Sequence, residues 1–256
     1  MAGLTDLAAR VDDAARYAKA IPQLTVGIPD LGIDDAYAIQ ALSVRRRVDR
    51  GERRIGVKMG LTSRAKMLQV GVDEVIWGRL TDAMLLEEGG SLSHGRYVHP
   101  RVEPEVAFLI GRPLAGTVTA LEAMAAVAGV APAMEIIDSR YEAFRFALPD
   151  VIADNSSSSG LVIGSFVLPT IDIGNLGTVL SVNGAVRQIG STAALLGHPV
   201  RSLVAAARMV AQGGEQLNPG DIVMAGGITA AHPLAVGEYV RADIEGLGRV
   251  AISVRE

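Results

Sequence analysis

Three glutamates carry the clearest chemical signal in the sequence. Glu103 and Glu105 are separated by one residue and lead into a wholly apolar run, 106–110. Residues two apart on a β-strand project from the same face, so these two carboxylates would share a site. Glu135 lies inside a second apolar stretch, 131–137. Three carboxylates, with water completing an octahedron, suit a hard cation such as Mg²⁺ or Mn²⁺.

A structural alternative exists for the first two glutamates. Glu103 and Glu105 could be solvated charges on an edge strand, where Pro104 would blunt that edge. Spacing alone does not separate the two interpretations. The position of Glu135 among apolar residues adds weight to a metal site, because a buried acid needs a compensating charge.

Lys58 is the next candidate for a chemical role. It lies between strand-like apolar residues and a glycine-rich turn. A cation placed there could hold a carboxylate or stabilise an enolate, and a lysine that only lays its stem along apolar surface is the alternative. Asp82, the segment 154–157 and Thr229 offer further polar groups in predicted loops and turns. Ordinary turn or cap chemistry explains those positions equally well.

The elements that must position these side chains follow from the spacing of apolar residues. A three- to four-residue repeat predicts a helix over 4–18, which Pro22 ends, and a second helix that starts near Asp34 and closes before Gly51. A further helix is predicted from Thr62 or Ser63 to Gln69.

Strand-like segments punctuated by Gly and Pro dominate the rest of the chain. The predicted strands are 55–59, 106–110, 161–167, 179–183, 221–225, 239–244 and 249–254, with helices at 119–127 and 200–212 and a hairpin turn at Asn183-Gly184. No dinucleotide-binding or P-loop glycine motif occurs. We expect an α+β fold, with an N-terminal helical region (1–75) and a strand-rich body (76–256) packed as one unit.

Composition narrows the classes of protein and site. The 256 residues are 49% apolar and 20% charged, which is typical of a globular chain. A net charge of -4 excludes a broad nucleic-acid footprint, and the absence of cysteine excludes disulfides, thiolate zinc sites and a cysteine nucleophile. The sequence has no signal-peptide pattern and no membrane-length apolar stretch, so we expect a cytoplasmic protein that binds neither nucleic acid nor membrane.

Four motifs, taken together, resemble a known family. Val57-Lys58-Met59-Gly60-Leu61-Thr62-Ser63, Glu103-Pro104-Glu105, Glu135-Ile136-Ile137-Asp138-Ser139-Arg140-Tyr141 and Ala153-Asp154-Asn155-Ser156-Ser157 occur in that order. They are similar to the hydratase/decarboxylase branch of the fumarylacetoacetate hydrolase superfamily, from about Lys58 to the C-terminus. The resemblance implies that superfamily's mixed, strand-rich β-fold and a homo-oligomer.

Within the branch, the segments 77–84, 138–146 and 226–231 are similar to members that decarboxylate 2-oxo-3-hexenedioate. The resemblance therefore implies metal-dependent loss of CO₂ from a small 2-oxo dicarboxylic acid, giving 2-hydroxypenta-2,4-dienoate in the meta-cleavage breakdown of aromatic compounds. It also implies a complex with the hydratase that consumes this product. Hydration of 2-hydroxypenta-2,4-dienoate is the alternative activity, and a non-catalytic scaffold for a partner enzyme is a second alternative.

The resemblance also assigns roles to single residues. Glu103, Glu105 and Glu135 are carried over as ligands of Mg²⁺ or Mn²⁺. The catalytic candidates are Lys58 and Asp82, and the substrate-binding candidates are Leu61, Asp154, Ser157 and Thr229. Strong pairing with the departing carboxylate would stabilise the ground state, so we expect an apolar or weakly polar surround there. The sequence does not identify the residues that form this surround.

Overall fold

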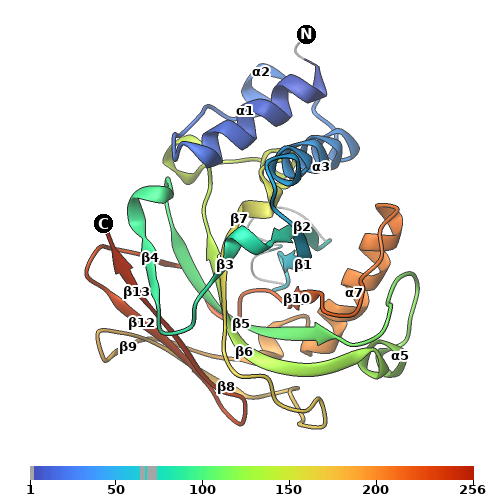
Figure 1. Cartoon of the computed structure of the whole chain (residues 1–256), viewed down its shortest axis with the longest axis vertical. Coiled ribbons are helices and arrows are strands. Elements are labelled where there is room, and N and C mark those ends of the chain that lie inside the picture. The colour runs from blue at the N-terminus through green and yellow to red at the C-terminus, as the bar shows by residue number, and fades with distance from the viewer. Residues whose placement is uncertain (1–2, 64–66, 68–73) are drawn as a thin grey trace.

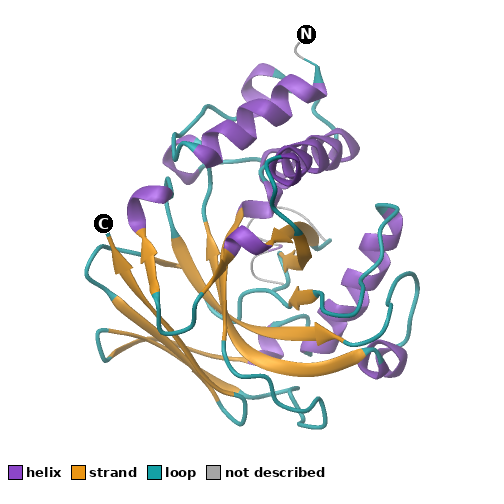
Figure 2. Ribbon diagram, viewed as in Figure 1, coloured by secondary structure: helices purple, strands orange, loops and turns teal. Residues whose placement is uncertain are grey.

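Helices gather at the N-terminal end and along one flank of the molecule, and two β-sheets form its body. The computed structural model describes residues 3–63, 67 and 74–256. Figure 2 shows the separation of helices and strands in this part of the chain. Among the described residues, no helix is both long and apolar enough to span a membrane. The helix predicted from Thr62 or Ser63 to Gln69 lies largely outside the described residues.

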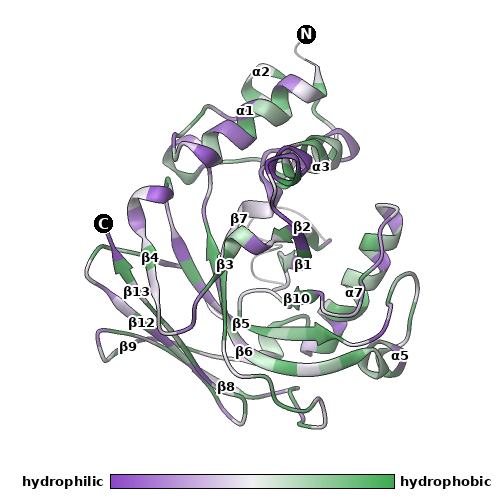
Figure 3. Cartoon of the chain, in the orientation of Figure 1, coloured by the Kyte–Doolittle hydropathy of each residue, from purple (hydrophilic) through white to green (hydrophobic). Residues whose placement is uncertain are grey.

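The N-terminal region is helical, as the apolar spacing predicts. α1 (Leu4–Arg16), α2 (Leu24–Gly27) and α3 (Ile33–Asp49) lie together at one end (Figure 1). Hydrophobic and hydrophilic residues alternate around α1 and α3 (Figure 3), and their apolar sides join one buried cluster with α6 (Leu148–Ala153). This layer therefore covers the element that leads into the site described below.

An ion-pair network joins α1 to α3. The Asp12 carboxylate is buried and accepts hydrogen bonds from Arg46 (2.7 Å) and Arg50 (2.6 Å). Burial alone would raise the pKa of Asp12, but the bonds from Arg50 and Arg46 outweigh it and hold this pKa below its ordinary value. The ion pairs of Asp12 with Arg46 and Arg50 thus hold α1 against α3.

The larger sheet has eight strands and carries the candidate metal ligands. Its order is β2-β1-β10-β5-β6-β7-β3, with β11 paired to β5. Its strands are β1 (Arg54–Gly60), β2 (Ile76–Thr81), β3 (Leu85–Leu86), β5 (Arg101–Ile110), β6 (Val127–Ile137), β7 (Ser158–Ile163), β10 (Ile222–Met224) and β11 (His232–Pro233). Leu80 of β2 and Leu161 of β7 belong to one buried cluster, so the sheet curls and its inner face encloses a core.

The smaller sheet packs against the larger one. Its order is β4-β13-β12-β8-β9, from the strands β4 (Ser91–Ser93), β8 (Gly177–Val182), β9 (Ala185–Ser191), β12 (Tyr239–Ile244) and β13 (Gly248–Arg255). The other helical elements that the described residues form are α5 (Ala120–Ala125), α7 (Pro199–Gln212) and the 3₁₀ turns η1 (Asp82–Met84), η2 (His94–Arg96), η3 (Glu142–Phe144), η4 (Asn155–Ser157) and η5 (Thr192–Ala194).

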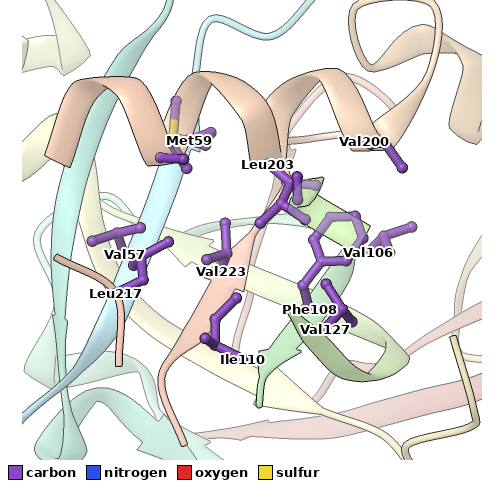
Figure 4. Packing of buried hydrophobic residues seen from close by; sticks show 14 of the residues in the cluster. Val57, Met59, Val106, Phe108, Ile110, Val127, Val200, Leu203, Leu217 and Val223 are labelled. Atoms are coloured by element: carbon purple, nitrogen blue, oxygen red, sulfur yellow. The ribbon is translucent and has the colours of Figure 1, made fainter. Parts of the chain in front are cut away.

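The hydrophobic core lies on both sides of the larger sheet. Leu203 of α7 packs against Val106 and Phe108 of β5 in the largest cluster (Figure 4). On the same face of this sheet, a second cluster that includes Met134 of β6 and Val240 of β12 fills the space between the sheets. The cluster that holds Leu80 and Leu161 includes Ala107 of β5 and lies on the opposite face. Because both faces are covered, β5 and β6 are held rigidly, which is what a metal site needs of the strands that carry its ligands.

Most predicted elements are confirmed, with differences that have physical reasons. The Asn183-Gly184 hairpin joins β8 to β9, with both residues at positive φ (51° and 79°), as a tight two-residue turn requires. The sequence analysis did not identify β6, which contains Pro132, a residue disfavoured in central strands. It also missed β2 and started β5 too late. The fold class, a strand-rich α+β fold with N-terminal helices, is as expected.

The division expected at residue 75 stays a prediction. β1 precedes that position, yet it pairs with β2 and in parallel with β10. The helical region and the strand-rich body therefore share the larger sheet. The parallel pairing of β1 with β10 also places Lys58, opposite Met224, on an interior strand of the sheet.

Candidate metal centre and substrate cavity

The three glutamates meet on the inner face of the curled sheet. Glu103 of β5 lies directly opposite Glu135 of β6 in the strand register, and Glu105 follows two residues later on the same face. One carboxylate oxygen from each residue lies within 4.8 Å of the others, and all three side chains are buried. β5 lies between β10 and β6, so the alternative of solvated charges on an edge strand is wrong.

This cluster has the electrostatics of a site that needs a cation. Burial, and then the charge of Glu135, raises the pKa of Glu105 well above its ordinary value. Burial also raises the pKa of Glu135, against the opposing charge of Lys58. The Oε1 atoms of Glu105 and Glu135 are buried and accept no hydrogen bond from the described residues. Converging carboxylates with open lone pairs fit a hard divalent ion, which supplies the missing positive charge.

A backbone donor fixes one of the carboxylates. The Gly226 N–H donates to Oε2 of Glu105 at 2.7 Å. Gly226 has a φ of +108°, and an added Cβ would overlap Oγ1 of Thr62, so only glycine fits this close approach. The close approach at Gly226 thus fixes the Glu105 carboxylate within the cluster.

Lys58 points into the same cluster. Its Nζ lies 3.1 Å from Oε2 of Glu135 and donates to the carbonyl oxygen of Ser156 at 2.9 Å. The side chain is only 5% exposed, so the alternative of a lysine whose head group reaches solvent is wrong. A buried ammonium beside three carboxylates can neutralise part of their charge and face a ligand at the same time.

A cavity of about 750 Å³ opens over the cluster. Its polar lining includes Lys58, Glu103, Ser157 and Thr229, and its apolar lining, the apolar wall, includes Leu61, Ile76, Ile137, Phe144, Phe146 and Val151. Leu61, Ser157 and Thr229 therefore lie where the sequence analysis expected substrate-binding residues, although contact with a substrate stays a prediction. The apolar wall has the character expected around a departing carboxylate.

Two predicted site residues lie elsewhere. Asp82 follows the end of β2 farthest from the cavity, where it pairs with Arg53 at 3.0 Å. Asp154 is fully buried and pairs with Arg140, and burial raises the pKa of Asp154 to about 6. Neither belongs to the described residues that line the cavity. A turn residue and a buried ion pair look the same in sequence as a polar ligand-binding residue, and their position gives these two assignments no support.

Asp154 instead precedes a strained turn that builds one wall of the site. Asn155, Ser156 and Ser157 all have positive φ, at 52°, 53° and 61°. This left-handed backbone conformation is costly for residues other than glycine, so contacts with neighbouring segments must stabilise it. The Asn155 amide exchanges two 2.8 Å hydrogen bonds with the backbone of Arg79, and the Ser156 hydroxyl donates to the Trp77 carbonyl at 2.7 Å. The turn thereby aims the Ser156 carbonyl at Lys58.

Replacing Asn155 by alanine is expected to destabilise the protein by about 3 kcal/mol, because two buried hydrogen bonds are lost and alanine pays for the left-handed conformation. Asn155→Gly loses the same bonds without the conformational cost, so we expect it to be more stable than Asn155→Ala by about 1 kcal/mol. Urea unfolding of the three proteins measures both differences. Wild-type stability in the alanine variant would contradict the supporting role of Asn155.

Sequence comparison identifies relatives along nearly the whole chain. Residues 66–255 match the fumarylacetoacetate (FAA) hydrolase C-terminal family. A protein of a Pseudomonas species, a 4-oxalocrotonate decarboxylase, is 53% identical over 250 residues, which cover 98% of this chain and 97% of that protein. A 2-keto-4-pentenoate hydratase of Paraburkholderia xenovorans is 35% identical over 240 residues, 93% of this chain and 89% of the hydratase.

A solved structure is also closely similar. It is a 4-oxalocrotonate decarboxylase from Pseudomonas putida, complexed with magnesium and adipate. It superimposes with a TM-score of 0.95 at 37% identity and covers 98% of this chain and 97% of its own. The likeness thus includes the N-terminal helices as well as the sheets.

Proposed function

Because the chain belongs to the fumarylacetoacetate hydrolase family, we propose that it is a divalent-metal-dependent carboxy-lyase acting on 2-oxo-3-hexenedioate (4-oxalocrotonate). Family membership confirms the resemblance that the sequence motifs indicate. The observation that carries the proposal is the buried glutamate cluster with Lys58 beside it, open to a cavity with an apolar wall. The decarboxylase relative is 53% identical and the hydratase relative 35%, which favours loss of CO₂ over hydration.

Glu103, Glu105 and Glu135 are the residues that would hold the metal, and the decarboxylase of known structure is complexed with magnesium. When bound there, Mg²⁺ or Mn²⁺ would supply Lewis acidity toward the 1-carboxylate and 2-keto oxygens of the substrate. Converging anionic oxygens are the donors that such hard ions prefer. The assignment of these three residues as ligands is part of the proposal.

Lys58 and the apolar residues of the cavity wall would stabilise the charge that develops and exclude water. Breaking the bond to the distal carboxylate releases CO₂ and moves the bonding pair through the alkene to the 2-oxygen, which is then protonated to give the dienol. Lys58 is placed to stabilise negative charge on that oxygen. Phe144, Phe146 and Val151 would exclude water from the leaving carboxylate.

The proposal includes a cytoplasmic location and an assembly. Several copies of this chain, or a complex with the hydratase that consumes the product, would fit the chemistry. The product is an unstable dienol, so direct transfer to the next enzyme would protect it.

The test is CO₂ release from 2-oxo-3-hexenedioate in the presence of Mg²⁺. We expect release that EDTA abolishes and that added Mg²⁺ restores. The same protein is offered 2-hydroxypenta-2,4-dienoate in parallel. Water addition to that compound without CO₂ release from the first would make the chain a hydratase, and inactivity toward both would favour a non-catalytic scaffold.

A further inference from the structure

Arg101 is a cation in the cavity wall that none of the roles above uses. It lies two residues before Glu103 on β5, and residues two apart share a face, so its side chain is directed to the same side of the sheet. Two residues of a strand span roughly 7 Å, so Arg101 lies beyond the glutamate cluster in the direction of the apolar wall. A dicarboxylic acid held at the glutamates by its 2-oxo acid end would extend toward it.

We propose that Arg101 is the specificity-determining residue that binds the second carboxylate of the diacid, at the end of the cavity remote from the glutamates. This inference rests on the proposed function, whose substrate class it refines. It assigns the diacid preference to a residue outside the motifs that carry the metal site.

The charge of Arg101 is available to a ligand. Its guanidinium makes no hydrogen bond or ion pair with a described residue, whereas Lys58, the other cation among the described lining residues, is bonded to Glu135 and Ser156. Arginine binds carboxylates in a two-pronged geometry that a lysine cannot reproduce. A ligand carboxylate is therefore the counter-charge that the cavity lacks at this position.

An aromatic ring holds the guanidinium in place. The Cζ atom of Arg101 lies 4.0 Å from the centre of the Phe144 ring. Ala143 and Phe144 both have positive φ, 56° and 57°, which is costly for an alanine and more so for a phenylalanine. The η3 turn is thus bent against its preference, and the bend puts the ring into the cavity wall under Arg101.

The Phe144 ring limits how strongly Arg101 pairs with a ligand carboxylate. The face of the Phe144 ring attracts the guanidinium, so Arg101 divides its charge between the ring and the ligand. The surrounding wall is apolar, through Phe146, Val151 and Ile137. The distal carboxylate loses its charge as CO₂ leaves, so its pairing with Arg101 stabilises the ground state more than the transition state. Arg101 is thereby expected to contribute to KM.

The decisive experiment compares two inert ligands that differ at one end. 2-Oxoadipate and 2-oxohexanoate share the 2-oxo acid end and the chain length, and only the first has a distal carboxylate. We expect the Mg²⁺-loaded wild-type protein to bind 2-oxoadipate at least about tenfold more tightly by titration calorimetry. Arg101→Met should remove this preference while leaving 2-oxohexanoate affinity within about threefold, and Arg101→Lys should keep part of it.

Arg145 provides the matched control. It is exposed, follows Phe144 on the same loop and does not belong to the described cavity lining. Arg145→Met removes a nearby positive charge, and the preference for 2-oxoadipate should persist in this variant. A preference that persists in Arg101→Met, or one that disappears equally in Arg145→Met, overturns the inference.

Kinetics separates this inference from the proposed function. With 2-oxo-3-hexenedioate, Arg101→Met should raise KM about tenfold and leave kcat unchanged or higher. A kcat loss as large as the KM change would contradict a role in binding alone. If the wild-type protein releases no CO₂, the proposed function fails, yet a diacid preference lost only in Arg101→Met would still support the carboxylate site.

Discussion

Replacing Glu135 or Glu105 by glutamine is expected to lower CO₂ release from 2-oxo-3-hexenedioate by on the order of a thousandfold, with the fold retained. Glutamine has nearly the same shape as glutamate but no charge, so each variant keeps its packing and loses one anionic donor of the cluster. Titration calorimetry with Mg²⁺ should show binding in the wild-type protein and little in either variant.

Stability measurements separate loss of the site from loss of the fold. In the metal-free protein the three carboxylates repel, and the raised pKa of Glu105 shows that its charged form is disfavoured there. Neutral glutamine should therefore leave the metal-free protein as stable as wild type, or more so. Mg²⁺ should raise the Tm of the wild-type protein and not that of the variants, because only binding to the folded state stabilises it.

Glu142→Gln supplies the control. Glu142 is exposed on the loop beside the cavity and outside the glutamate cluster, so this variant should keep both Mg²⁺ binding and turnover. Full activity in Glu105→Gln and Glu135→Gln would remove the basis for a metal site. Unfolding of both variants would instead assign the glutamates a structural role.

The sequence predicted the parts of this site that depend on local periodicity. Alternation along one strand places Glu103 and Glu105 on one face, and the structure confirms it. Nothing local specifies that Glu135 lies opposite Glu103, because register between strands is set by the packing of both faces. The family resemblance, which draws on the order of separate motifs, brought Glu135 and Lys58 into the same hypothesis.

The site roles of Asp82 and Asp154 stay predictions that their positions do not support. The family resemblance grouped Asp82 and Asp154 with the site, but one lies at the far end of the β1–β2 pair and the other pairs with Arg140. Arg101 was overlooked although its signal was present. One further step of the same alternation, from Glu103 back to Arg101, places it on the face of the cluster.

Replacing Lys58 by methionine is expected to lower kcat by about a hundredfold to a thousandfold at saturating Mg²⁺, because charge that develops on the 2-oxygen would lose the stabilising Lys58 ammonium. The readout is CO₂ release over a range of substrate concentrations. Methionine fills the space of the lysine stem, so the loss reports on the charge and not on a cavity. Wild-type kcat in this variant would reduce Lys58 to a structural counter-ion of Glu135.

The pH dependence of metal binding tests the same residue independently of turnover. Lys58 lowers the pKa of both Glu105 and Glu135, in opposition to burial. Without it, both carboxylates hold their protons to higher pH, and protons compete with the metal because only the charged carboxylates bind Mg²⁺. The midpoint of Mg²⁺ binding on a pH titration should therefore move upward in Lys58→Met and remain close to wild type in Lys58→Arg. An unchanged midpoint would mean that the ammonium 3.1 Å from Glu135 does not set the protonation of the cluster.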